Sequence, residues 1–216
     1  MTTVKTDMLA YYAERAETYE EIYDKPERQD ELDELHERVQ EALFGQKVLE
    51  LACGTGYWTA QYAEMAESVL ATDINPAVLD IARAKPFGEN VRFQLMDAFA
   101  PQVDAPVTAC FAGFWWSHVM RQDQIPFLEK LRAALGKDTW LVMLDNSYVE
   151  GSSTSIARTD LQGNTFQIRK LPNGDSYEIL KNFPTDSALR KKLGVMAREI
   201  KIVRMEHFWM LSCRLK

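Results

Sequence analysis

Residues 48–59 form an apolar run that leads through Glu50 into a turn with two glycines, Gly54 and Gly56. The residues after this turn have helical character, so the segment predicts a strand, a sharp turn and a helix. Glycine has no Cβ atom, so the strand can turn sharply and a ligand can lie against its backbone. The first N–H groups of the next helix have no partner within that helix and favour an anionic group. We therefore expect an α/β sheet that binds a ligand where this strand ends.

A carboxylate ends the next apolar run. Asp73 closes residues 68–73, seventeen positions after Gly56. Nucleotide sites of α/β proteins place an acid at about this distance to bind the ribose hydroxyls. The two strand ends together predict one nucleoside-like ligand.

Strand and helix patterns alternate from residue 47 onward, which predicts a parallel sheet with helices on both faces. The expected parallel strands are 47–52, 68–73, 91–95, 107–114 and 139–146. Two last strands, 199–205 and 207–215, are joined too tightly for a crossover helix and should be antiparallel. We expect an α/β fold: one Rossmann-like domain over residues 1–216, with a seven-stranded, mostly parallel sheet whose last strand is reversed.

Two further segments complete this expected domain. Residues 6–44 have helical periodicity and predict an N-terminal helical cap, divided near Pro26. Residues 164–181 hold two strand-like runs around Asn173-Gly174, a strong hairpin signal. This hairpin insertion could be a lid over a ligand, a dimer contact or a surface ribbon.

Composition limits the partners and the compartment. The formal net charge is −7 over 216 residues, which disfavours nucleic acids and anionic membranes as partners. No apolar run reaches the length of a membrane span or a signal peptide, so we expect a cytoplasmic protein. The three cysteines, an odd number without C-x-x-C spacing, should be reduced and buried. We expect a monomer or a homodimer.

The motif Glu50-x-Ala52-Cys53-Gly54-x-Gly56, with Asp73 after it, resembles the class I S-adenosylmethionine-dependent methyltransferases. Residues 11–19 are similar to the N-terminal segment that closes over the cofactor in small-molecule members, such as ubiquinone-type and natural-product methyltransferases. The resemblance implies S-adenosylmethionine as cofactor: the glycine turn would carry its methionine half, Asp73 its ribose and residues 96–99 its adenine. The expected cofactor-binding residues are Tyr12, Tyr19, Glu50, Ala52, Gly54, Thr55, Gly56, Asp73, Ile74, Asp97, Ala98, Phe99 and Phe114.

The resemblance also implies that the segment after the fourth strand, residues 114–118, faces the methyl acceptor. His118 is the candidate catalytic base, because imidazole titrates near neutral pH, although it could equally be a loop histidine bonded to backbone. The expected acceptor pocket consists of Trp115, Trp116, Asn146, Tyr148 and Arg169. Core packing would explain at least one of the two tryptophans equally well.

The pair Asp145-Asn146 resembles the magnesium ligands of catechol-type methyltransferases. Those enzymes need another aspartate at the end of the fourth strand, where this chain has Gly113-Phe114-Trp115. We therefore expect no metal, since the oxygen ligands would be too few.

The expected function is methyl transfer from S-adenosylmethionine to an oxygen or nitrogen atom of a small-molecule acceptor. A cofactor-binding module without turnover is the first alternative. A nicotinamide-dependent oxidoreductase is the second, but Thr59 stands where a dinucleotide fingerprint has its third glycine, and Tyr57 and Trp58 add bulk where a pyrophosphate would approach.

Overall fold

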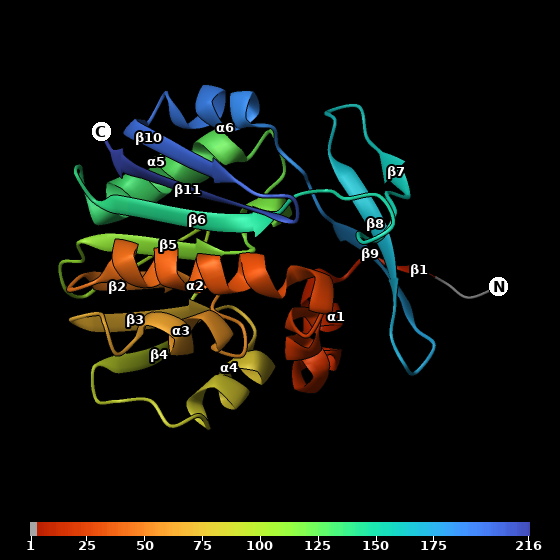
Figure 1. Cartoon of the computed structure of the whole chain (residues 1–216), viewed down its shortest axis with the longest axis horizontal. Helices are drawn as coiled ribbons and strands as arrows, with labels where there is room; N and C mark the ends of the chain where they lie inside the picture. The colour runs from red at the N-terminus through yellow and green to blue at the C-terminus, as the bar shows by residue number, and fades with distance from the viewer. Residues whose placement is uncertain (1–3) are drawn as a thin grey trace.

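A seven-stranded sheet forms the centre of the molecule. The computed structural model describes residues 4–216. The strands are β2 (Lys47–Leu51), β3 (Ser68–Asp73), β4 (Val91–Leu95), β5 (Ala109–Gly113), β6 (Trp140–Asn146), β10 (Ala197–Arg204) and β11 (Phe208–Leu215), in the order β10-β11-β6-β5-β2-β3-β4 (Figure 1). β11 runs antiparallel to both of its neighbours, and the pairs from β6 to β4 are parallel. The predicted α/β fold with a reversed last strand is confirmed.

Helices cover both faces of this sheet, whose inner strands β2, β3, β5 and β6 are apolar on both sides. Successive residues of β2 point to opposite faces: Val48 joins one core cluster and Leu49 the other. The first cluster includes α2 (Gln29–Leu43) and α3 (Tyr57–Tyr62), and the second includes α5 (Gln124–Leu135) and α6 (Asp186–Leu193). α4 (Pro76–Arg83) packs beside β3 and β4. No helix among residues 4–216 is long and apolar enough to span a membrane.

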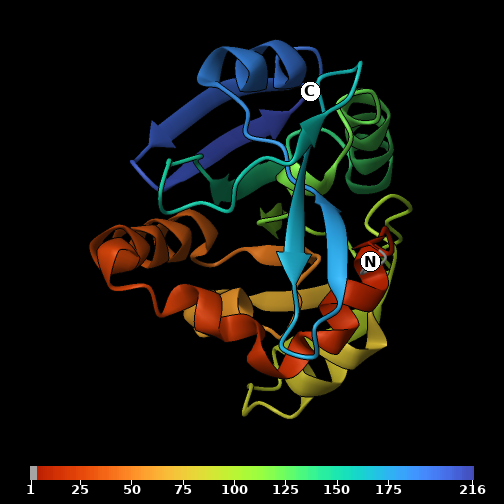
Figure 2. The ribbon, with the colours of Figure 1, turned by 90° about the vertical axis from the view of Figure 1, so that its right-hand side faces the viewer.

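A second, smaller sheet stands beyond the carboxyl ends of the parallel strands (Figures 1 and 2). It consists of β1 (Val4–Lys5), β7 (Arg158–Thr159), β8 (Thr165–Lys170) and β9 (Ser176–Leu180), in the order β1-β9-β8-β7. β8 and β9 pair antiparallel at positions where the sequence predicts a hairpin. β1 and β7 were not expected, because a two-residue strand has no periodicity to detect.

The N-terminal segment runs along the same edge of the large sheet as the second sheet. It contains α1 (Met8–Glu14) and two 3-10 helices, η1 (Ala16–Tyr23) and η2 (Pro26–Arg28), before α2. Asp7 caps α1 by accepting a hydrogen bond from the Ala10 N–H at 2.9 Å. Tyr11 is buried against Tyr177 of β9, with ring centroids 5.5 Å apart. This contact joins the N-terminal segment to the second sheet.

Candidate active site

The glycine turn after β2 combines left-handed backbone with close packing. Ala52, Gly54 and Gly56 have φ of +52°, +57° and +77°. A Cβ atom on Gly56 would lie 3.3 Å from the Cβ of Ala82, so this glycine lets the turn pack against α4. A Cβ on Gly54 would meet nothing within 4 Å, and Gly54 borders an open cavity.

Asp73 joins the ends of β2 and β3. Its Oδ2 accepts a hydrogen bond from the Gly54 N–H at 2.9 Å, and its Oδ1 accepts one from the Asn75 N–H at 2.8 Å. Burial raises the pKa of this carboxyl, and the backbone N–H groups oppose that rise. Each oxygen can accept a further hydrogen bond from a ligand.

These residues open onto a cavity of about 380 Å³, here called the glycine-turn cavity. Ten of the residues predicted to bind the cofactor line it: Tyr12, Tyr19, Ala52, Gly54, Asp73, Ile74, Asp97, Ala98, Phe99 and Phe114. They come from the ends of β2, β3, β4 and β5 and from the N-terminal segment. Its walls are mostly apolar, with carboxylates at Asp73 and Asp97, which suits a nucleoside.

Three of the residues predicted to bind the cofactor do not line this cavity: Glu50, Thr55 and Gly56. Because side chains alternate along β2, Glu50 points toward α3, where Thr59 Oγ1 and Tyr62 OH each donate to Glu50 Oε2 at 2.7 Å. Burial raises the pKa of Glu50 to about 7. Thr55 is also buried, and its hydroxyl donates to Glu20.

The two tryptophans differ from their predicted place in the acceptor pocket. Trp115 lines the glycine-turn cavity, with its ring edge-to-face with Phe99 at 5.6 Å. Its indole Nε1 is buried and has no hydrogen-bond partner among residues 4–216. Trp116 is 1% exposed and packs against Phe127 of α5, in the core. A short turn, η3 (Trp116–His118), sends the two rings in different directions.

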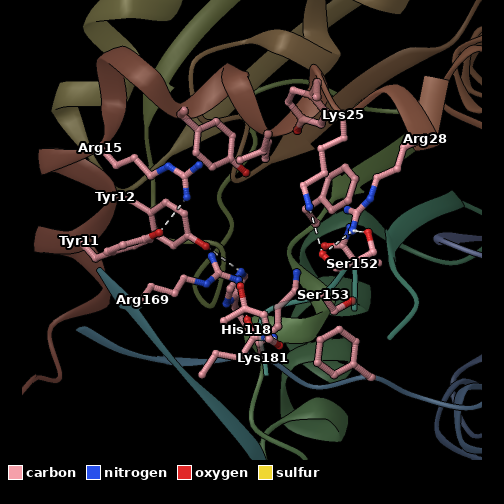
Figure 3. A pocket seen from close by; sticks show the side chains of 18 of the residues that line it. Tyr11, Tyr12, Arg15, Lys25, Arg28, His118, Ser152, Ser153, Arg169 and Lys181 are labelled. Atoms are coloured by element: carbon pink, nitrogen blue, oxygen red, sulfur yellow. Dashed lines mark hydrogen bonds between the residues drawn. The ribbon is translucent and has the colours of Figure 1, made fainter. Parts of the chain in front are cut away.

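A second cavity, of about 550 Å³, lies between the N-terminal segment and the second sheet (Figure 3). We call it the cationic cavity, because the residues that line it include six basic side chains and no aspartate or glutamate. The basic residues are Arg15, Lys25, Arg28, Arg169, Lys170 and Lys181. Of the predicted acceptor residues, Asn146 and Arg169 line this cavity. Tyr148 does not: it is 40% exposed and packs its ring against Phe183 at 5.2 Å.

Four residues line both cavities: Tyr12, Tyr19, Phe114 and His118. The two cavities therefore adjoin at these side chains. A ligand in one cavity and a ligand in the other would approach each other there, as a transfer of a group between them requires.

His118 is held as a neutral imidazole. Its Nδ1 lies 2.6 Å from the carbonyl oxygen of Leu180, which can only accept, so Nδ1 carries the proton. Nε2 then accepts from the Tyr12 hydroxyl at 3.0 Å. Burial, with a further contribution from the Lys181 charge, lowers the pKa of His118 to about 3. At neutral pH this side chain holds no extra proton, and both of its nitrogens have partners.

Asp145, in the segment that resembles a magnesium site, is paired with a lysine from elsewhere in the chain. Lys181 donates to Asp145 Oδ1 at 2.8 Å, and both side chains are almost fully buried. The Ser117 N–H donates to Asp145 Oδ2 at 2.9 Å. Burial alone would raise the pKa of Asp145, but Lys181 lowers it overall. The pair fixes Lys181 at the wall of the cationic cavity.

Sequence reasoning missed most of the basic residues of the cationic cavity. Arg28 lies in η2 and Lys25 directly precedes it, Arg15 precedes η1, and Lys181 follows β9. Each looked like an ordinary charge in a polar segment, because only the tertiary structure brings the segments together. The one available signal was Lys181, a charge directly after the apolar run 176–180.

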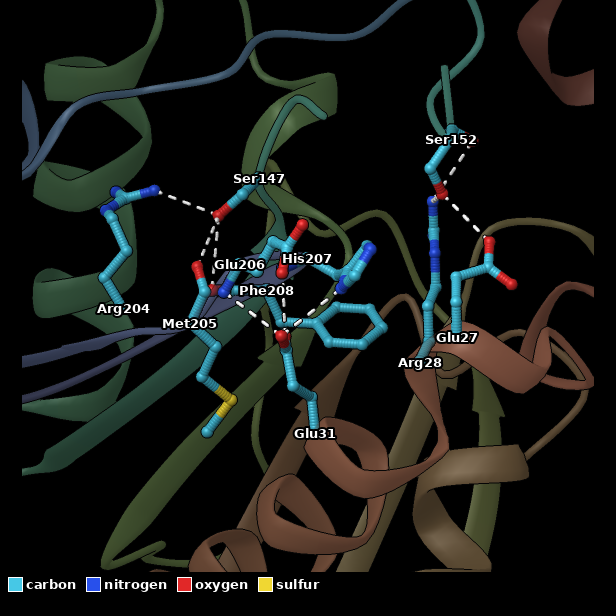
Figure 4. A network of polar contacts seen from close by, with 10 residues as sticks. All are labelled: Glu27, Arg28, Glu31, Ser147, Ser152, Arg204, Met205, Glu206, His207 and Phe208. Atoms are coloured by element: carbon cyan, nitrogen blue, oxygen red, sulfur yellow. Dashed lines mark hydrogen bonds and ion pairs between the residues drawn. The ribbon is translucent and has the colours of Figure 1, made fainter. Parts of the chain in front are cut away.

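One cluster of residue types that can bind metal connects two elements of the fold. Glu31, Glu206 and His207 place their ligand atoms within 4.8 Å of one another. Glu31 accepts from the backbone N–H groups of Glu206 and His207 and contacts the His207 ring (Figure 4). These bonds tie α2 to the β10–β11 turn, and we assign the cluster no metal.

The chain is similar to known methyltransferases. The family of methyltransferase domains matches residues 48–138. A malonyl-[acyl-carrier protein] O-methyltransferase from Serratia marcescens is 31% identical over 69 residues. That match covers 32% of this chain and 27% of the relative, so the chain spans about a quarter of that protein's length.

Solved structures match almost the whole chain. A protein named DhpI in complex with SAH is 26% identical, with a TM-score of 0.79, covering 96% of this chain and 94% of that one. DhpI in a complex with SAM and HEP is 25% identical, with the same TM-score and 95% of each chain covered. The CcbJ methyltransferase from Streptomyces caelestis, 16% identical with a TM-score of 0.63 over 84% of this chain and 88% of its own, shares the fold.

Proposed function

We infer that this chain, which belongs to the class I S-adenosylmethionine-dependent methyltransferases, transfers a methyl group to an oxygen atom of a small anionic acceptor. The observation that carries this proposal is the cationic cavity: six basic side chains and no carboxylate line the space next to the glycine-turn cavity. Such a lining attracts carboxylates, phosphates or phosphonates and disfavours amines.

The glycine-turn cavity fits the cofactor. Asp73 can accept hydrogen bonds from the ribose hydroxyls, Gly54 leaves room beside the backbone, and Ile74 and Phe99 offer apolar surfaces for the adenine. The buried, unpartnered Nε1 of Trp115 is a further donor in this space. When bound, S-adenosylmethionine supplies a methyl group on a positively charged sulfur, which an oxyanion can take up without further activation.

The neutral state of His118 agrees with an acceptor that is already ionised when it binds. His118 is a poor general base, because its pKa lies near 3 and its Nε2 already accepts from Tyr12. A carboxylate or phosphoryl oxyanion has no proton to lose in the reaction. The chain then contributes three things: the charges of Arg169 and Lys181, exclusion of water by the aromatic side chains, and alignment of acceptor and cofactor.

The test is release of S-adenosylhomocysteine with short carboxylates and alkylphosphonates, compared with neutral alcohols and amines of the same size. We expect turnover with the anions alone, and little change in rate between pH 6 and 9. His118→Asn should keep at least a tenth of the rate, whereas Arg169→Met should raise KM for the anions by at least tenfold. Turnover confined to amines or alcohols would contradict the proposal. Binding of S-adenosylhomocysteine with no turnover of any acceptor would favour a binding module.

A further inference from the structure

Four of the six basic side chains of the cationic cavity form two separate groups. At one end Arg169 and Lys181 lie beside His118, which also borders the glycine-turn cavity. At the other end Lys25 and Arg28 converge on Ser152, away from the first group (Figure 3). We call these the inner end and the outer end.

The inner end carries one cation without a carboxylate partner. Lys181 is paired with Asp145, so its charge is balanced. Arg169 donates to the neutral amide of Gln167 at 2.9 Å, and its buried Nε has no hydrogen-bond partner among residues 4–216. A guanidinium in this state is suited to a carboxylate or phosphoryl group.

The cations at the outer end also donate to neutral oxygens and not to carboxylates. Lys25 Nζ and Arg28 Nη2 both donate to the backbone carbonyl of Ser152, at 3.0 and 3.3 Å, and Arg28 also donates to the Ser152 hydroxyl at 2.8 Å. The buried Nε of Arg28 has no partner in the described part of the chain. Two cations thus share neutral oxygens, which leaves most of their charge unbalanced.

The nearest carboxylates balance this charge only weakly. Glu27 lies 3.9 Å from Lys25, is 48% exposed and accepts from the Ser152 hydroxyl. Glu31 already accepts hydrogen bonds from the backbone N–H groups of the β10–β11 turn (Figure 4). Neither carboxylate lines the cationic cavity.

We propose that the acceptor carries two acidic groups, one at each end of the cationic cavity. The group at the inner end receives the methyl, and the group at the outer end is recognised by Lys25 and Arg28 and stays ionised. The product is therefore an ester at the inner group that keeps the negative charge of the outer group; a dicarboxylate gives a monoester with one negative charge. This inference rests on the proposed function and names the substrate class of the same site.

The experiment compares dianions with monoanions of matched length. The protein saturated with S-adenosylhomocysteine is titrated calorimetrically with the dicarboxylates from malonate to adipate and with the monocarboxylates from propionate to hexanoate. We expect at least one dianion to bind tenfold or more tightly than the monoanion of the same carbon number. Methylation of the same compounds is measured in parallel.

Variants test whether the preference for the dianion comes from the outer end. Arg28→Met and Lys25→Met should each reduce the preference for the dianion at least fivefold while the monoanion affinity stays within twofold. Arg169→Met should weaken both kinds of ligand. Arg38→Met, on α2 outside the cavity, removes the same charge and should change neither. Unchanged affinity for S-adenosylhomocysteine reports that each variant is folded.

Two failures are distinguishable. If monoanions and dianions of equal length bind and react alike, or if the preference for the dianion survives both outer-end variants, the two-acid inference is wrong and the proposed function stands. If neither these carboxylates nor the alkylphosphonates bind or are methylated, the proposed function is wrong as well.

Discussion

At the scale of single residues, Asp73 shows how one carboxylate can both build a site and serve it. Its two oxygens accept hydrogen bonds from the backbone N–H groups of Gly54 and Asn75. These bonds fix the side chain at the wall of the glycine-turn cavity. The orientation is thus set before any ligand binds, so little side-chain entropy remains to be lost on binding.

Asp73→Ala should weaken binding of S-adenosylhomocysteine by about 1.5 to 3 kcal/mol, the usual size of a hydrogen bond to a charged group. Calorimetric titration measures this loss. Asp80→Ala removes an exposed carboxylate of α4 and is the matched control. An unchanged dissociation constant in Asp73→Ala would reject the ribose role.

At the scale of elements, the glycine turn meets α4 at Gly56. Here an alanine would adopt a left-handed conformation, which costs about 1 to 2 kcal/mol, and would also crowd Ala82. Gly45 has a similar φ of +67° with nothing within 4 Å of an added Cβ. Gly45→Ala should therefore show the backbone cost alone.

We expect Gly56→Ala to lower the free energy of unfolding by about 1 kcal/mol more than Gly45→Ala does, because of the added contact. Urea denaturation of both variants measures the difference. Equal losses would mean that the turn and α4 separate easily, and the close packing inferred at Gly56 would then be wrong.

Elements with long apolar patterns were predictable from the sequence, and the others were not. The inner strands of the large sheet (β2, β3, β5, β6 and β11) are buried on both faces, so their residues form apolar runs. β1 and β7 have two residues each, and residues 16–23 and 26–28 form 3-10 helices where the pattern suggested ordinary helix. The motif identified the glycine-turn cavity. The cationic cavity brings together side chains from η2, β8 and the residue after β9, and no local sequence pattern records that arrangement.

At the scale of the whole molecule, two buried groups give opposite dependences of stability on pH. His118 has a folded-state pKa of about 3 and an unfolded value of 6.5, so only the unfolded chain binds its proton between these values. Its contribution to stability is present above pH 6.5 and is lost as pH falls. Glu50 has a folded-state pKa of about 7 and an unfolded value of 4.5, so its contribution is present below pH 4.5 and is lost as pH rises to 7.

Between pH 4.5 and 6.5 the two slopes oppose each other, each at about 1.4 kcal/mol per pH unit. The stability advantage of the wild type over His118→Asn should grow with pH in this window, and its advantage over Glu50→Gln should shrink. Urea denaturation at pH 4.5, 5.5 and 6.5 tests both trends. Parallel curves for the wild type and both variants would disprove the assigned burial effects.

The contact between α1 and β9 also has a consequence for synthesis of the chain. The Tyr177 hydroxyl donates to Glu14 across 163 positions, and Tyr11 is buried against the same strand. During translation Glu14 leaves the ribosomal exit tunnel 163 residues ahead of Tyr177, so this contact cannot form until that whole stretch has been made. Until then α1 has no strand against which to bury its aromatic side chains.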